Sequence, residues 1–143
     1  RVEITKSEKS WEKHGGNMTE GPQVLIKDGT LHIIYSACGA QSDSYCLGML
    51  TYKGGDILNK SSWSKSSKPV FQSGNGVYSP GHCSFTKSPD GKEDWIVYHA
   101  ANKKGDSQKW LRNIRIQKFT WNGTTPVFGK PVASDSWIDA PSE

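Results

Sequence analysis

One arrangement of short apolar strands occurs twice in this chain, and this repeat is the feature that most restricts its fold. Residues 35–37 (YSA) correspond to residues 98–100 (YHA) at an offset of 63, and residues 68–70 (KPV) correspond to residues 130–132 (KPV) at an offset of 62. Four strands that recur at a near-constant period are typical of β-propeller blades. The repeat alone also fits a β-sandwich, which is the alternative.

The first repeat is expected to occupy residues 19–73. Apolar runs at 24–26 and 31–35 flank Asp28 and Gly29, a pair typical of a two-residue β-hairpin turn. The remaining strands of this repeat are expected at 47–52 and 69–71.

The second repeat is expected to occupy residues 74–133, followed by a C-terminal tail at 134–143. Its strands are expected at 82–86, 95–99, 114–121 and 127–132. Residues 1–18 carry a short strand signal at 2–5 and a polar link, and they are expected to form the end of a preceding blade.

The number of blades indicates an incomplete ring. A propeller closes with typically about four to eight blades, whereas two would leave sheet faces and edges unburied. We therefore expect this chain to be part of a larger propeller, completed by a second chain or by a segment outside these residues. The chain begins at Arg1 without Met or a signal peptide, which indicates a mature, trimmed or excised polypeptide.

Composition excludes several classes of protein. A hydrophobic content of 34% with 15 Gly and seven Pro excludes disorder and favours a β-rich fold with many turns. The net charge of +4 comes from scattered lysines without an aromatic-basic motif, so no nucleic-acid partner is expected. No apolar run approaches the roughly 20 residues of a membrane span, so no membrane partner is expected either. Sequons at Asn17, Asn59 and Asn122 suit a secreted protein.

The three cysteines, Cys38, Cys46 and Cys83, show no zinc-site spacing. Cys38 and Cys46 flank a short loop and could form a disulfide in an oxidising compartment. Alternatively, all three are small buried hydrophobic residues, which is the interpretation that we prefer.

Glu20 is a candidate catalytic residue because of its place in the chain. It stands at a Gly-Pro corner directly before the first expected strand, where a rigid sheet can hold a side chain in a cleft. By spacing alone, an ordinary exposed glutamate before a turn is the better-supported interpretation.

Five segments in order carry a resemblance to a known family. They are SWEKHGGNMTEGPQVL, DSYCLGML, SWSKSSKPVF, SPGHCSFTKSPDGKEDWIVYHA and RNIRIQKFTWNGTTPVFGKPV. Together they resemble the C-terminal two blades of glycoside hydrolase family 43, whose members are five-bladed β-propellers acting on arabinose- and xylose-containing polysaccharides. The resemblance implies an all-β, five-bladed β-propeller, of which this chain supplies about two four-stranded blades and a remnant of the preceding blade.

The resemblance also implies roles for particular residues. Glu20, in Thr-Glu-Gly-Pro, matches the general acid that protonates the leaving glycosidic oxygen. His82 follows Ser-Pro-Gly where relatives commonly have Gly-Pro-Gly. It matches a histidine near the propeller axis that in many members helps to hold a metal ion, often Ca²⁺, or a water in the central channel beneath the sugar, which makes it a candidate for substrate binding as well. The alternative is a buried histidine whose ring is satisfied by backbone groups. Arg112 matches an arginine that projects into the pocket, contacts the substrate and influences the acid, and a solvated charge is the alternative for it. Arg115 has the opposite strand parity and is expected to be a structural or surface charge. No organic cofactor is implied.

Trp11 is a further candidate for substrate binding, because an aromatic face can stack on the apolar C–H groups of a sugar. Packing between blades is the better-supported interpretation of this residue. Trp63, Trp95 and Trp121 lie in or beside expected strands and are interpreted as core residues.

The family's mechanism needs a base and a second aspartate besides the acid, and neither is expected in this chain. Asp28, Asp90 and Asp94 lie in turns and are interpreted as turn formers. Inversion requires a base on the opposite face of the sugar, roughly 6.5–9.5 Å from the acid. The chain alone is therefore expected to have little or no glycosidase activity.

The motifs look most like those of an exo-acting α-L-arabinofuranosidase that releases arabinose from arabinan or arabinoxylan. A β-xylosidase of the same family is the near alternative, and a non-catalytic carbohydrate-binding propeller is the alternative from another class. The expected partners are an arabinose- or xylose-containing polysaccharide or oligosaccharide and the polypeptide that supplies the N-terminal blades. The expected location is extracellular.

Overall fold

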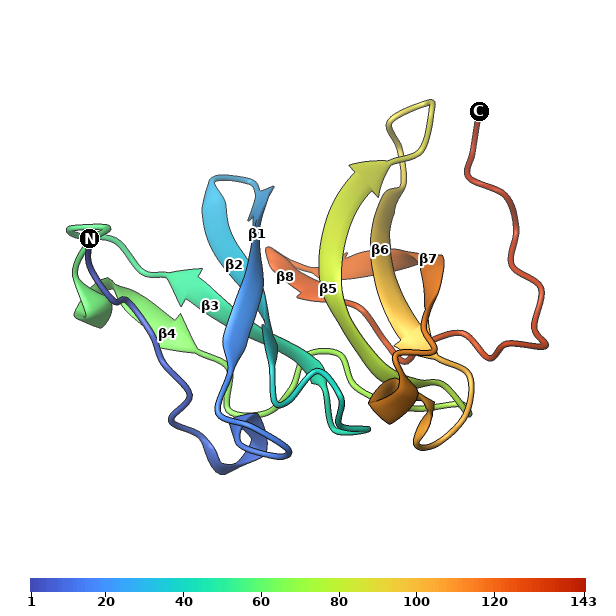
Figure 1. Cartoon of the computed structure of the whole chain (residues 1–143). Coiled ribbons are helices and arrows are strands. Elements are labelled where there is room, and N and C mark those ends of the chain that lie inside the picture. The colour runs from blue at the N-terminus through green and yellow to red at the C-terminus, as the bar shows by residue number, and fades with distance from the viewer.

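Two four-stranded antiparallel sheets stand side by side in the computed structural model, which describes residues 1–143 (Figure 1). Each sheet is a meander in which every strand pairs with the next strand of the sequence. The first sheet consists of β1 (Thr19–Lys27), β2 (Thr30–Ala37), β3 (Cys46–Tyr52) and β4 (Trp63–Lys65). The second consists of β5 (Tyr78–Lys87), β6 (Asp94–Ala101), β7 (Asn113–Asn122) and β8 (Thr125–Val127). Short 3-10 helices lie in the connections: η1 (Ser10–Glu12), η2 (Lys60–Ser62) and η3 (Asp106–Lys109).

The predicted all-β repeat is confirmed, because β5 to β8 reproduce the order of β1 to β4. Tyr35 on β2 and Tyr98 on β6 occupy corresponding buried positions. The hydroxyl of Tyr35 donates a hydrogen bond to buried Glu12, and that of Tyr98 donates one to buried Gln117. The five-bladed ring, which two sheets cannot test, stays a prediction.

The predicted hairpin between β1 and β2 is also confirmed. Asp28 and Gly29 have positive φ values of 47° and 79°, and Lys27 pairs with Thr30 across the turn. Positive φ at both central positions is the geometry of a type I′ turn, whose twist matches that of the flanking strands. Asp and Gly are residues that tolerate this conformation, so the local sequence determines the hairpin.

Three strand predictions were wrong in position. Residues 2–5 form no strand, β4 is at Trp63–Lys65 rather than at 69–71, and β8 is at Thr125–Val127 rather than at 127–132. Pro69 and Pro131 have no N–H group to donate, which disfavours a regular ladder in the two predicted segments. The fourth strand of each sheet therefore precedes the Lys-Pro-Val sequence.

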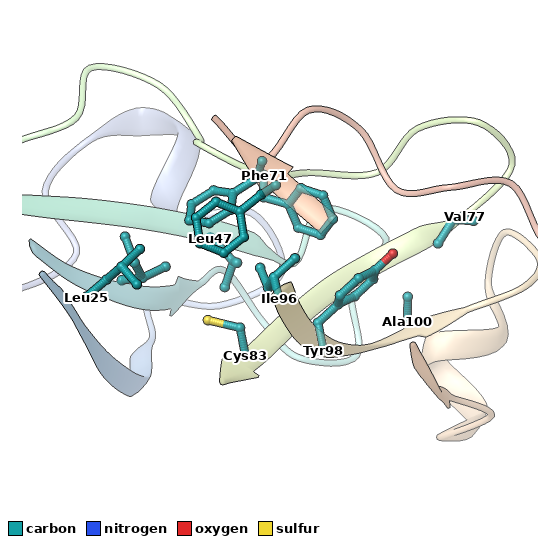
Figure 2. Close-up of a cluster of buried hydrophobic side chains, with 11 residues drawn as sticks. Leu25, Leu47, Phe71, Val77, Cys83, Ile96, Tyr98 and Ala100 are labelled. Carbon is teal, nitrogen blue, oxygen red and sulfur yellow. The ribbon is translucent and has the colours of Figure 1, made fainter. Parts of the chain in front are cut away.

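The main hydrophobic core lies between the two sheets (Figure 2). It joins Leu25, Ile34, Leu47 and Phe71 of the first repeat to Val77, Cys83, Ile96, Tyr98, Ala100, Phe119 and Phe128 of the second. The ring of Phe71 packs edge-on against that of Tyr98 with the centroids 4.9 Å apart. Each sheet therefore buries one apolar face only because the other sheet covers it.

A buried histidine adds a polar link between the sheets. Nδ1 of His32 lies 2.9 Å from Oγ1 of Thr51, and its Nε2 lies 2.8 Å from the carbonyl oxygen of Thr124 in the second repeat. Because both ring nitrogens have partners, the imidazole can be buried without an unsatisfied polar atom.

A second, smaller core covers the opposite face of the first sheet. It is made by Tyr35, Ala37, Cys38, Cys46, Leu50 and Trp63. Ile4 and Trp11 of the N-terminal segment pack against it. All three cysteines are free and buried, which agrees with the preferred interpretation, and burial raises the pKa of the Cys83 thiol to about 12.

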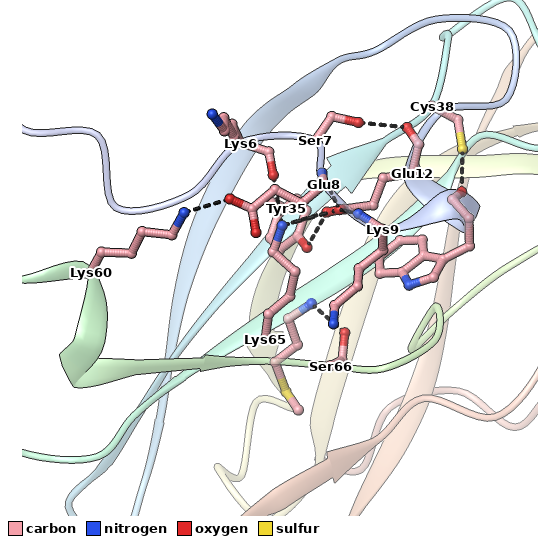
Figure 3. Close-up of polar contacts among 12 residues, drawn as sticks. Lys6, Ser7, Glu8, Lys9, Glu12, Tyr35, Cys38, Lys60, Lys65 and Ser66 are labelled. Atoms are coloured by element: carbon pink, nitrogen blue, oxygen red, sulfur yellow. Dashed lines mark hydrogen bonds and ion pairs between the residues drawn. The ribbon is translucent and has the colours of Figure 1, made fainter.

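Glu12 is a fully buried carboxylate that ties the N-terminal segment to the first sheet (Figure 3). Its Oε2 accepts hydrogen bonds from the backbone N–H groups of Glu8 and Lys9 at 2.8 and 2.7 Å. Its Oε1 accepts from the hydroxyl of Tyr35 at 2.8 Å and from the ammonium of Lys65 at 3.0 Å. Burial alone would raise the pKa of Glu12, but these donors together lower it below its usual value. The carboxylate is therefore ionised and fully paired.

We expect Glu12→Gln to lower the free energy of unfolding by about 3 kcal/mol, because it removes the counter-charge of a nearly buried ammonium group on Lys65. Urea unfolding of the protein at neutral pH measures the loss. Glu8→Gln is the matched control, since it breaks a solvent-exposed pair with Lys60 and should change stability little. Equal effects of the two substitutions would contradict the structural role of Glu12.

Candidate active site

Glu20 lies where the pairing of β1 with β2 is interrupted. It pairs with Ser36, but the register shifts before the next pair, at Gln23. The intervening Gly21 has a φ of 55°, and Pro22 has no N–H group to contribute to the ladder. A bulge of this kind turns a side chain away from its regular direction on the sheet, and here it does so for the half-buried Glu20.

A tyrosine that the sequence analysis did not identify as a site residue holds Glu20. The hydroxyl of Tyr45 donates a hydrogen bond to Oε1 of Glu20 at 2.7 Å. The same hydroxyl oxygen lies 3.5 Å from Nδ1 of His82 on β5. Tyr45 therefore lies between the two predicted site residues, which come from different sheets.

His82 occupies a constrained backbone position on β5. Its φ is 54°, a conformation that residues other than glycine seldom adopt. Its backbone N–H donates to Oγ of Ser36 on β2 at 2.7 Å. A Cβ atom at Gly21 would lie 3.1 Å from the His82 ring, so the β1 bulge and this imidazole are close neighbours. The backbone thus places His82 beside the segment that carries Glu20.

A second histidine, His99 on β6, completes this cluster. Its ring stacks on that of Tyr45, with the centroids 5.8 Å apart and an interplanar angle of 1°, and lies 6.1 Å from the ring of His82. Nδ1 of His99 is buried without a hydrogen-bond partner. The pKa of His99 is lowered to about 4. Burial is the largest cause, and the charges of Arg112 and His82 add to it. His99 is therefore neutral at neutral pH.

Arg112 lies directly before β7 and contributes a positive charge to the same site. Its guanidinium donates to the carbonyl oxygen of Ala40 and stacks over the indole ring of Trp110 at 4.3 Å from the centroid. Its Nε is buried without a partner. Its charge contributes to the lowered pKa of His99. The structure thus brings Arg112 together with the cluster that contains Glu20 and His82.

Asp43 anchors the loop that carries Tyr45 to the second sheet. Its carboxylate accepts hydrogen bonds from the backbone N–H of Gly105 and the hydroxyl of Ser107, both at 3.0 Å. In the same loop, the carbonyl oxygen of Ser42 accepts from the hydroxyl of Ser79 at 2.7 Å. These contacts fix the position of Tyr45 relative to the histidines of the second sheet.

Two of the residues considered from the sequence make structural contacts elsewhere. Trp11 packs on the second core, and its carbonyl oxygen accepts from the thiol of Cys38 at 2.9 Å. It also borders a polar hollow of about 410 Å³, which none of the other candidate site residues lines. Arg115 donates to the carbonyl oxygen of Val132 at 3.3 Å and to the hydroxyl of Ser134 at 2.7 Å, which agrees with its predicted structural role.

His82 is not part of a metal-binding group of three or more His, Cys, Asp or Glu side chains in this chain. Ca²⁺ takes about six to eight oxygen ligands. No group of three or more His, Cys, Asp or Glu side chains is arranged to hold a metal ion, and Nδ1 of His82 faces a tyrosine hydroxyl. The residues of this chain do not form a calcium site by themselves, so Ca²⁺ or a water near His82 stays a prediction.

The fold and the site together define a class of protein. Two four-stranded antiparallel sheets of the kind that form β-propeller blades meet at a boundary where a carboxyl group lies beside histidine and arginine side chains. Residues 2–126 match the family described as glycosyl hydrolases family 43. The chain belongs to this family.

Relatives with described activities support the same assignment. The chain is 47% identical over 140 residues to an extracellular exo-α-(1→5)-L-arabinofuranosidase of Streptomyces avermitilis, covering 92% of this chain and 29% of the relative. It is 37% identical over 139 residues to α-L-arabinofuranosidase B of Pyricularia oryzae, covering 92% of this chain and 28% of the relative.

A solved structure gives the same result for the fold. The crystal structure of α-L-arabinofuranosidase from Lactobacillus brevis superimposes with a TM-score of 0.85 at 42% identity, and the match covers 95% of this chain and 44% of that one. The chain therefore spans less than half of each of these three proteins.

We expect the imidazole of His99 to titrate near pH 4 rather than near its unperturbed value of about 6.5. Between these values the unfolded state binds more protons, so the stability of the protein should fall as the pH drops from about 6.5 toward about 4, and this residue should have no effect above that range. Histidine ring NMR signals recorded against pH measure the midpoint, with His99 assigned from its missing signal in a His99→Asn variant. A midpoint at or above about 6.5 would contradict the desolvated state of this ring.

Proposed function

We propose that this chain supplies the general acid of an inverting, exo-acting α-L-arabinofuranosidase, and that the acid is Glu20. The observation that carries the proposal is the position of this carboxyl group. It stands half-buried on the β1 bulge, has one oxygen fixed by Tyr45, and lies in a cluster with His82 and the charge of Arg112. In this role Glu20 protonates the glycosidic oxygen as its bond to the sugar breaks.

A second carboxylate must activate water on the opposite face of the sugar, because a single displacement with inversion needs both an acid and a base. The other aspartates considered from the sequence are engaged elsewhere. Asp90 accepts from Ser88 at 2.7 Å, and Asp94 pairs with Lys87 at 2.6 Å. We infer that the base and the third carboxylate come from N-terminal blades, supplied by a second chain or by a segment outside these residues.

The names of the relatives support the proposed substrate class. Two relatives are named α-L-arabinofuranosidases, one of them exo-acting on α-(1→5) linkages. We propose arabinan or arabinoxylan as the source of the arabinose released. The relative from Streptomyces avermitilis is also named extracellular, and we propose the same location for this protein. No helix in the structure is long and apolar enough to cross a membrane.

The surface of the first sheet provides a place for a further blade. Glu20 borders a mainly apolar hollow of about 250 Å³ on the face turned away from the second sheet. The hollow is lined by Ile4, Thr5, Thr19, Glu20, Pro22, Ile33, Tyr35 and Leu50. A preceding blade packed here would lie next to the acid, which is where the base and the third carboxylate are needed.

We expect Glu20→Gln, made in the complete protein, to lower kcat on linear α-(1→5)-arabino-oligosaccharides by about 100- to 10,000-fold. The rate is measured from the arabinose released. Glu3→Gln is the control, because it removes a carboxylate from an exposed side chain. An unchanged rate in the Glu20→Gln variant would exclude this residue as the acid. Faster hydrolysis of an aryl xyloside than of an aryl arabinofuranoside would favour a β-xylosidase, and hydrolysis of neither would favour a binding propeller.

We also expect the 143-residue chain alone to show little or no hydrolysis, because it lacks the proposed base. Adding the polypeptide that carries the remaining blades should restore activity. The rate of arabinose release with and without that polypeptide tests this expectation. Full activity of the chain alone would contradict the requirement for further blades.

A further inference from the structure

Tyr45 is the most constrained side chain around the proposed acid. It is fully buried, at the end of the β2–β3 loop and directly before β3. A Cβ atom at Gly81 would overlap its ring, so the absence of a side chain at position 81 makes room for the tyrosine. On another side the ring lies parallel to that of His99. These two contacts from the second sheet define one orientation for the phenol.

The orientation directs the hydroxyl group at Glu20. A phenol has one proton to donate, and the 2.7 Å distance to Oε1 of Glu20 is that of a good hydrogen bond, whereas Nδ1 of His82 is at the outer limit of 3.5 Å. Burial raises the pKa of Tyr45 well above the usual range of a phenol, so the group keeps its proton. Tyr45 is therefore a fixed donor to one of the two carboxyl oxygens.

We propose that Tyr45 is a positioning residue for the proposed general acid, holding Oε1 of Glu20 so that Oε2 carries the proton and faces the leaving group. This inference rests on the proposed function. Besides Glu20 on β1, the polar and charged groups that surround the Tyr45 hydroxyl are those of Ser36 on β2, His82 on β5, His99 on β6 and Arg112 before β7.

The proton balance of the step agrees with this assignment. The proton on Oε2 of Glu20 moves to the glycosidic oxygen as the bond between that oxygen and the sugar breaks, and Glu20 becomes a carboxylate. The hydrogen bond from Tyr45 then has a charged acceptor, and such bonds are roughly twice as strong as those between neutral groups. The interaction therefore becomes stronger along the reaction, which is the condition for lowering a barrier.

Tyr45→Phe in the complete protein tests the inference, because it keeps the ring and removes only the hydroxyl group. We expect kcat on α-(1→5)-arabino-oligosaccharides, whose leaving group needs protonation, to fall by about 10- to 100-fold, with KM nearly unchanged. We expect 2,4-dinitrophenyl arabinofuranoside, whose leaving group needs almost no protonation, to be cleaved at close to the wild-type rate.

Tyr98→Phe is the matched control. It removes the hydroxyl of another buried tyrosine, which donates to Gln117 at 2.8 Å and does not contact the proposed acid. Any loss that it causes should be the same for both substrates. Gly81→Ala is a second test. The added Cβ must displace the Tyr45 ring and so move its hydroxyl away from Glu20, although the tyrosine itself is kept, and the variant should reproduce the loss that depends on the leaving group.

The possible outcomes separate the inference from the proposed function. Equal losses on both substrates, or no loss on either, in the Tyr45→Phe variant would overturn the positioning role. An unaffected Glu20→Gln variant would overturn the proposed function itself. A large loss in Glu20→Gln together with a loss in Tyr45→Phe confined to the oligosaccharide supports both.

Discussion

The packing of one sheet against the other is the constraint on which the rest of the structure depends. Neither sheet can bury its apolar face alone, and the main core draws its residues from both. The candidate site is a product of the same packing. Glu20 and Tyr45 belong to the first repeat, whereas His82, His99 and Arg112 belong to the second. A repeat that folded separately would therefore contain only part of the site.

The buried polar groups of this structure are of two kinds, those that are fully hydrogen-bonded and those that have no partner. Glu12 has four donors around one carboxylate, and that network ties the N-terminal segment to the first sheet. By contrast, five buried side-chain atoms have no partner. Two of them, Nδ1 of His99 and Nε of Arg112, lie at the candidate site, and the other three are Oγ1 of Thr5, Nε1 of Trp11 and Nε of Arg115. Burying a polar atom without a hydrogen bond is costly, so such atoms in a native fold call for an explanation such as a catalytic role or an unseen partner.

The sequence predicted features that depend on neighbouring residues or on motifs. The hairpin follows from Asp28 and Gly29, and the family motifs identified Glu20, His82 and Arg112, which the structure brings to one site. Tyr45 and His99 were not identified as site residues, because their roles arise from contacts between distant segments. The one local signal was Gly81 within a strand, since a glycine there often marks close approach by another group. The misplaced fourth strands had a different cause, because Lys-Pro-Val resembles a strand in its apolar pattern but lacks one backbone donor.

The overlap that a side chain at position 81 would have with Tyr45 also limits how this protein can evolve. A larger residue at position 81 forces the ring at position 45 to move, so it fits without strain only in a chain that has already lost that ring. If the residue at position 81 is enlarged first, the intermediate protein is overpacked at this contact. Positions 81 and 45 are therefore epistatic. In diverging relatives, the glycine at position 81 should be replaced only where the aromatic residue at position 45 has been replaced.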